Sequence, residues 1–142
     1  SNFFSLMKNY KSLLFIGLVS ISMILTACDH RTKHRKMIVN NSDYDLLIFT
    51  GGYEGFVSDS IFIGKHSHVT ILENGGISKV YEYEDCSVYV DSIHSKIVGH
   101  DSLKLSLNLA DKTNWFFSVL KKTFGEGGNC ECRTVIRNED IQ

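Results

Sequence analysis

The chain has 142 residues, 43% of them hydrophobic and 22% charged, which suits one globular domain with a targeting segment. Its net charge of −1 hides an asymmetry: residues 29–36 carry four basic residues against one acid (+3), whereas residues 37–142 carry nine against 15 acids (−6). This acidic balance argues against nucleic acid as a partner, because phosphate binding needs clustered positive charge.

A positive start and an apolar run open the chain. Lys8 and Lys11 follow Met7, residues 13–25 are almost wholly apolar, and small residues then precede Cys28. This is the three-part layout of an export signal, and the apolar run is shorter than the ~20 residues that a membrane span needs. We therefore predict a helical signal peptide over residues 1–27, of which residues 1–6 are interpreted as not native.

The stretch Leu25-Thr26-Ala27-Cys28 resembles the lipobox of bacterial lipoprotein precursors. The resemblance implies that the signal is cut before Cys28, that the thiol carries a diacylglyceryl group, and that acyl chains anchor the protein to a bilayer. It places the domain outside the cytoplasm, in the envelope of a Gram-negative bacterium, on the inner or outer membrane. The alternatives are an uncleaved membrane anchor, which the basic residues after the apolar run favour, and an ordinary secretory signal.

Residues 28–36 are interpreted as a flexible, lipidated tether. After Cys28 they read DHRTKHRK, a basic stretch without a long apolar run. Basic side chains near anionic headgroups contribute ~1 kcal/mol each to membrane binding. We expect the tether to lie along the bilayer and the domain to begin at residue 37.

Residues 37–142 predict an all-β domain, because short alternating or apolar runs are separated by glycine-rich turns. The expected strands are residues 36–39, 46–50, 56–64, 68–73, 86–93, 102–110 and 129–138. The clearest is 102–110, where four leucines share one face. Residues 77–85 could be a strand or a helical turn, and 113–125 a helix or a strand, with strand favoured for its first half. About seven strands are expected to form an antiparallel, two-sheet β-sandwich.

Two segments of this domain carry a second, looser resemblance. IVNNSDYDLLIF (residues 38–49) and RTVIRNEDI (residues 133–141) resemble small uncharacterised lipoproteins of Gram-negative envelopes. The resemblance implies a β-sandwich and no particular activity.

Three cysteines remain beside Cys28. Cys130 and Cys132 are two residues apart and share a face of one expected strand, so Cys86 could pair with either of them but not with both. Such a bridge is expected outside the cytoplasm and would add ~3–4 kcal/mol to stability. The alternatives are three buried thiols or a soft-metal site that uses the C-x-C pair.

No residue set predicts a catalytic reaction, because no nucleophile lies in a known activating pattern. We therefore expect a non-enzymatic binding or interaction module without a cofactor, whose partner is the bilayer and possibly a basic envelope protein. The alternative is a small metal-binding or enzymatic periplasmic protein that uses His66, His68 and the Cys130/Cys132 pair, since histidine and cysteine are common metal ligands.

Overall fold

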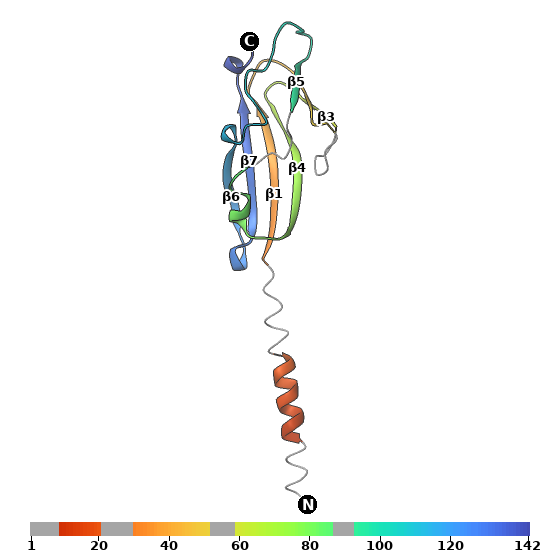
Figure 1. Ribbon diagram of the computed structural model, residues 1–142, viewed down its shortest axis with the longest axis vertical. Coiled ribbons are helices and arrows are strands. Elements are labelled where there is room, and N and C mark those ends of the chain that lie inside the picture. The colour runs from red at the N-terminus through yellow and green to blue at the C-terminus, as the bar shows by residue number, and fades with distance from the viewer. Residues whose placement is uncertain (1–8, 21–29, 52–58, 87–92) are drawn as a thin grey trace, which may run out of the picture.

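The structure is a computed structural model that describes residues 9–20, 30–51, 59–86 and 93–142 (Figure 1). Residues 9–20 are helical, and their side chains are exposed. None of the helices in these ranges has both the length and the apolar character to cross a membrane. Much of the predicted signal peptide, together with Cys28, lies outside the described residues.

The remaining described residues form a mainly β fold, as predicted, with seven strands in two sheets. The strands are β1 (Arg31–Asn40), β2 (Leu46–Phe49), β3 (Ser60–Ile63), β4 (Ser67–Ile77), β5 (His94–Ile97), β6 (Phe116–Lys122) and β7 (Gly128–Ile136). The larger sheet has the order β4-β1-β7-β6 and the smaller one β3-β2-β5. One pairing differs from the antiparallel expectation: β1 and β7 run parallel, so the first strand lies beside the last (Figure 1).

The predicted flexible tether is wrong from residue 31 onward, because Arg31 to Lys36 form the first half of β1. β1 is a central strand that pairs with β4 on one side and with β7 on the other. Its side chains alternate: Thr32, His34 and Lys36 are buried, while Arg31 and Lys33 are exposed. The basic stretch is therefore half of a strand with a polar inner face.

One hydrophobic core contains side chains from both sheets. Its members are Ile38, Leu46, Ile48, Ile61, Ile63, Ile71, Cys86, Ile97, Leu109, Trp115, Cys132, Ile136 and Ile141. β-branched residues dominate the list, as expected of strands whose side chains pack on a pleated surface. The burial of β2 and β3 has a period of two, and so has that of β7 apart from Glu131, which is also buried.

Residues 102–110 do not form the strand that their alternating leucines predict. The segment makes a single bridge, Leu105 to Ile141, and its backbone meets the C-terminus through Lys104 and Ser106. Leu109 is nevertheless 2% exposed and belongs to the core. The alternation thus reports burial of one side of the segment, and turns around Asn108 end it before a ladder forms.

The two ambiguous segments have definite structures. Within residues 77–85, β4 ends and the 3-10 helix η1 (Val80–Tyr83) follows. Within 113–125, β6 follows the 3-10 helix η2 (Lys112–Asn114), as favoured, and the 3-10 turn η3 (Phe124–Glu126) comes next. β5 was not expected, and most of the predicted strand 86–93 lies outside the described residues. A last 3-10 turn, η4 (Asn138–Asp140), precedes the C-terminus.

Asn40 joins the two sheets at the end of β1. Its side chain is fully buried, and Nδ2 donates to the carbonyl oxygens of Tyr44, Ile63 and Gly64 at 2.7, 3.3 and 3.1 Å. Its Oδ1 accepts from the backbone and the hydroxyl of Ser42. One amide therefore fixes the turn after β1 against the end of β3.

Replacing Asn40 by alanine is expected to lower the free energy of unfolding by about 2 kcal/mol, because buried carbonyls lose their donor. Urea unfolding of the purified variant measures the loss. Asn138→Ala is the matched control, since the Asn138 amide bonds to exposed Asp43 and its removal is expected to cost about 0.5 kcal/mol. Equal losses in the two variants would contradict the structural role of Asn40.

Candidate functional site

The predicted disulfide exists, and the structure chooses between the two partners that the sequence left open. Cys86 is bonded to Cys132, and Cys130 is a free, buried thiol. Cys130 Sγ lies 3.8 Å from the carbonyl oxygen of Lys33, and burial raises the pKa of this thiol. Both properties make Cys130 an inert core residue rather than a nucleophile, which would need a lowered pKa.

The residues of the alternative metal site do not come together among the described positions. His66 lies in the turn before β4, where its Nε2 is 2.9 Å from the carboxylate of Asp43, and both side chains are exposed. His68 is in β4, opposite Val39. Cys132 is committed to the disulfide, so the C-x-C pair offers one thiol instead of two. No group of three or more His, Cys, Asp or Glu side chains with metal-ligand geometry occurs in the described part of the chain.

A buried polar cluster surrounds the disulfide, and the sequence reasoning missed it. His34 of β1 stacks on Tyr83 of η1, with ring centroids 4.6 Å apart and planes inclined by 8°. Its Nδ1 is 3.2 Å from Asn74 Oδ1, and its Nε2 is 3.5 Å from Cys132 Sγ. Burial lowers the pKa of His34, with a smaller contribution in the same direction from nearby Lys36.

Lys36 is the other basic member of the buried cluster, with 3% of its surface exposed. Its Nζ donates to the carbonyl oxygen of Cys86 at 2.7 Å and lies 5.1 Å from the ring centroid of Trp115. Burial lowers its pKa to about 8, although the negative charge of Asp85 opposes the shift. A lysine of this kind is costly to bury, so its carbonyl and aromatic contacts offset part of that cost.

The buried cluster is not an open reaction centre. Lys36 and Trp115 are at most 5% exposed, so a substrate does not reach them in this structure, and His34, which is 4% exposed, borders a pocket on the larger sheet. Their spacing in the sequence was a usable signal: Thr32, His34, Lys36, Ile38 and Asn40 continue one period-two pattern into the apolar part of β1. The charge of RTKHRK concealed this pattern.

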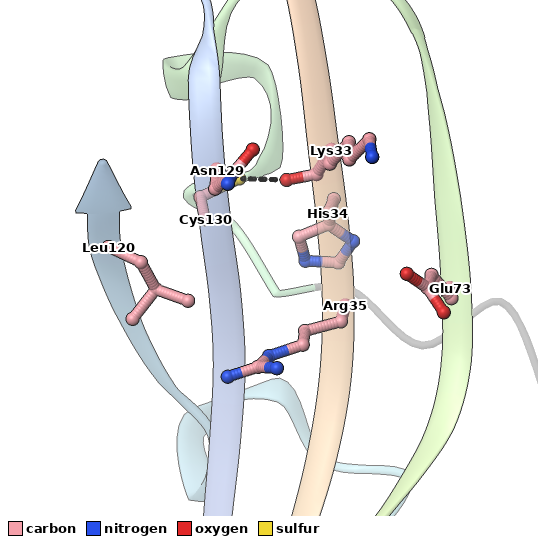
Figure 2. Close-up of a pocket in the computed structure, with 7 residues that line it drawn as sticks. All are labelled: Lys33, His34, Arg35, Glu73, Leu120, Asn129 and Cys130. Atoms are coloured by element: carbon pink, nitrogen blue, oxygen red, sulfur yellow. Dashed lines mark hydrogen bonds between the residues drawn. The ribbon is translucent and has the colours of Figure 1, made fainter. Parts of the chain in front are cut away.

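The outer face of the larger sheet is the more accessible candidate site. A shallow pocket of about 110 Å³ lies there. Figure 2 shows its lining residues, which come from β4, β1, β7 and β6. It is lined by Lys33, His34, Arg35, Glu73, Leu120, Asn129 and Cys130. A wider hollow of about 350 Å³ adjoins it and is lined by Arg31, Lys33, Thr123, Phe124 and Asn129. Lys33 and Asn129 belong to both.

Charge on this outer face is mainly positive, although residues 37–142 as a whole are acidic. Glu131 is almost fully buried and accepts from Arg35 at 2.8 Å and from Arg133 at 2.9 Å. In Figure 2 Arg35 extends from β1 across β7. One carboxylate thus holds two guanidinium groups, because Arg35 donates from Nε and Nη2 to Oε2 and Arg133 donates from Nη2 to Oε1. The face suits contact with an anionic surface, and its described residues include no nucleophile paired with a base.

Comparison with known proteins gives no family assignment. No protein-family model matches the chain, and no curated protein or solved structure matches it either. Function must therefore be inferred from the residues themselves.

Proposed function

We propose that this protein is a lipid-anchored module of a Gram-negative cell envelope that acts through contacts rather than catalysis. The lipid is carried by Cys28, at the start of the mature chain, and the domain stands outside the cytoplasm. The observation that carries the proposal is the order of features before Cys28: a positive start, an apolar run and Leu25-Thr26-Ala27.

The disulfide supports a location outside the cytoplasm. Disulfides persist in oxidising compartments and are rare in the cytosol, and Cys86–Cys132 sits in the core beside the central strands. The helix over residues 9–20 is compatible with a signal segment. The two sheets that share one core support a β-sandwich architecture for the domain.

The proposed anchor joins the sheet almost directly. His30 is the first described residue of the β domain, and its carbonyl accepts from the backbone of Ser78. Only Cys28 and Asp29 precede it in the mature chain, so the lipid would lie close to the end of the larger sheet at which β1 begins. A basic envelope protein is the proposed second partner, because residues 31–142, which include the whole of β1, carry 13 basic residues against 15 acids, a net charge of −2.

Replacing Cys28 by alanine is expected to abolish lipid attachment and to move the protein from the membrane fraction to the soluble or unprocessed fraction. Cells that express each form are labelled with a clickable fatty acid, and the purified protein is weighed by mass spectrometry. The wild type is expected to carry the label and to begin at Cys28.

Cys130→Ala is the matched control, because it removes another free thiol but leaves the lipobox intact. It is expected to label like the wild type. An unmodified thiol at Cys28, or an intact leader on the native protein, would overturn the proposed anchoring.

A further inference from the structure

The end of the larger sheet that is nearest to Cys28 combines exposed apolar and unpaired basic side chains. We name it the basal surface and define it by Arg31, Lys33, Ile77, Lys121, Lys122 and Phe124. The strand registers place the strand residues at one end of the sheet: Arg31 is opposite Ile77, and Lys33 and Lys121 are both opposite Asn129. Lys122, opposite Gly128, is at the same end but points to the other face of the sheet. In Figure 1 this is the end of the larger sheet at which β1 begins.

The apolar members of the basal surface are unusually exposed for their size. Phe124 is 82% exposed and Ile77 is 71% exposed. Phe124 lines the wider hollow together with Arg31 and Lys33, so an apolar and two cationic side chains lie close together. This pairing is typical of surfaces that lie in the interface of a bilayer, where apolar groups enter the headgroup boundary and cations remain at the phosphates.

The basic members have no carboxylate partner in the described part of the chain. Arg31, Lys33, Lys121 and Lys122 are exposed and form none of its ion pairs, whereas Glu126, the acid of η3, is 2.7 Å from Lys79. Four uncompensated cations therefore gather at one end of a domain that is acidic elsewhere. Their charge is complementary to anionic lipid headgroups.

The proposed lipid anchor at Cys28 indicates that a membrane covers the basal surface. Cys28 precedes His30 by two residues, so its Cα lies at most about 7 Å from that of His30. His30 is held by Ser78 at the end of β4, and a Cβ on Gly125 of η3 would collide with the His30 ring. The turn that carries Phe124 is thus packed on His30, two residues after the proposed anchor.

We infer that the basal surface docks on an anionic membrane, so that the domain rests on the bilayer instead of swinging from it. This inference rests on the proposed lipid anchor, which would orient the domain. Phe124, Ile77 and the basal lysines would provide the affinity for the membrane. Each lysine near the surface is expected to change binding about 5-fold.

The first experiment uses the acylated protein purified from envelopes and reconstituted in phosphatidylglycerol vesicles that contain lipids brominated on their acyl chains. Phe124→Trp places a fluorophore on the basal surface, and Phe62→Trp is the matched control, because Phe62 is 58% exposed in the smaller sheet. The fluorescence emission of the Phe124→Trp variant is expected to shift to the blue and to be quenched by the brominated lipids. Vesicles of phosphatidylcholine are expected to reduce both effects. The fluorescence of the wild-type protein gives the background signal of the buried Trp115.

Quenching of Phe124→Trp no stronger than that of Phe62→Trp, in protein shown by mass spectrometry to be acylated, would overturn the docking and leave the anchor intact. A partner protein as the true occupant would give this same result in pure lipid.

The second experiment decides the docking even if Cys28 is found unmodified. Full-length, non-acylated protein is sedimented with phosphatidylglycerol vesicles, and the triple variant Lys33→Gln, Lys121→Gln, Lys122→Gln is expected to bind at least about tenfold more weakly than the wild type. The control triple variant Lys65→Gln, Lys96→Gln, Lys104→Gln removes the same charge elsewhere and retains the same N-terminal helix. Equal partitioning of the two triple variants would overturn the inference.

Discussion

Replacing Cys86 and Cys132 together by alanine is expected to lower the free energy of unfolding by about 3–4 kcal/mol. The bond closes a loop with a sequence separation of 46 residues, and both cysteines are at most 4% exposed. It also ties the segment after η1 to β7, in the middle of the larger sheet. Urea unfolding at neutral pH, followed by far-UV circular dichroism, measures the difference.

Cys130→Ala is the control for this experiment, because the same strand then loses a buried sulfur that is not part of a bridge. We expect it to cost about 1 kcal/mol, as for a small core truncation. Reduction of the wild type with dithiothreitol is expected to reproduce most of the loss seen in the double variant. An unchanged urea midpoint after complete reduction would show that the bridge does not contribute.

The second large effect concerns Lys36. Its pKa is about 8 in the folded protein against 10.5 ordinarily, a difference equivalent to about 3 kcal/mol. Below pH 8 both folded and unfolded chains hold the proton, and burial of the charge destabilises the fold by the full amount. Between pH 8 and 10.5 the unfolded chain binds more protons, so the contribution of Lys36 to stability increases as the pH rises.

Lys36→Met is therefore expected to be more stable than the wild type by about 1–2 kcal/mol at pH 7, since the lost hydrogen bond to the Cys86 carbonyl offsets part of the gain. The difference between the two proteins is expected to shrink as the pH approaches 9.5. Thermal unfolding between pH 7 and 9.5 measures both quantities, and Lys104→Met, at an exposed position, controls for general effects of lysine removal. Parallel curves for Lys36→Met and the wild type would be inconsistent with a buried, charged lysine.

The sequence predicted the strands whose alternation is apolar on one face. β2 and β7 were expected within one or two residues, because Leu46 and Ile48, and the series from Cys130 to Ile136, obey period two. Period two records which side chains are buried and not which backbone groups are paired. The leucines of residues 102–110 therefore gave a false strand.

The first half of β1 was missed for the opposite reason. Its inner face carries Thr32, His34 and Lys36, whose polarity is typical of solvent-exposed segments. They are tolerated inside because each has a defined contact: Thr32 donates to the carbonyl of Ser78, His34 stacks on Tyr83, and Lys36 reaches the carbonyl of Cys86. Such partners come from segments at least 46 residues away, and local patterning does not reveal them.

The disulfide partner was ambiguous for a geometric reason. Cys130 and Cys132 share one face of β7, so their strand position alone does not separate them. The choice depends on η1, which the sequence left open as strand or helical turn. This element brings Cys86 over β1 at Lys36, directly opposite Cys132 in the register.

The central position of β1 has a mechanical consequence for the lipid anchor proposed at Cys28. A pull on the N-terminus acts along β1, which lies between β4 and β7 and is hydrogen-bonded to both. Because ladder bonds run across the strands, such a force loads many of them at once in shear instead of peeling them one by one. A force that pulls the proposed acylated chain away from its bilayer would thus be resisted by both ladders of β1 together.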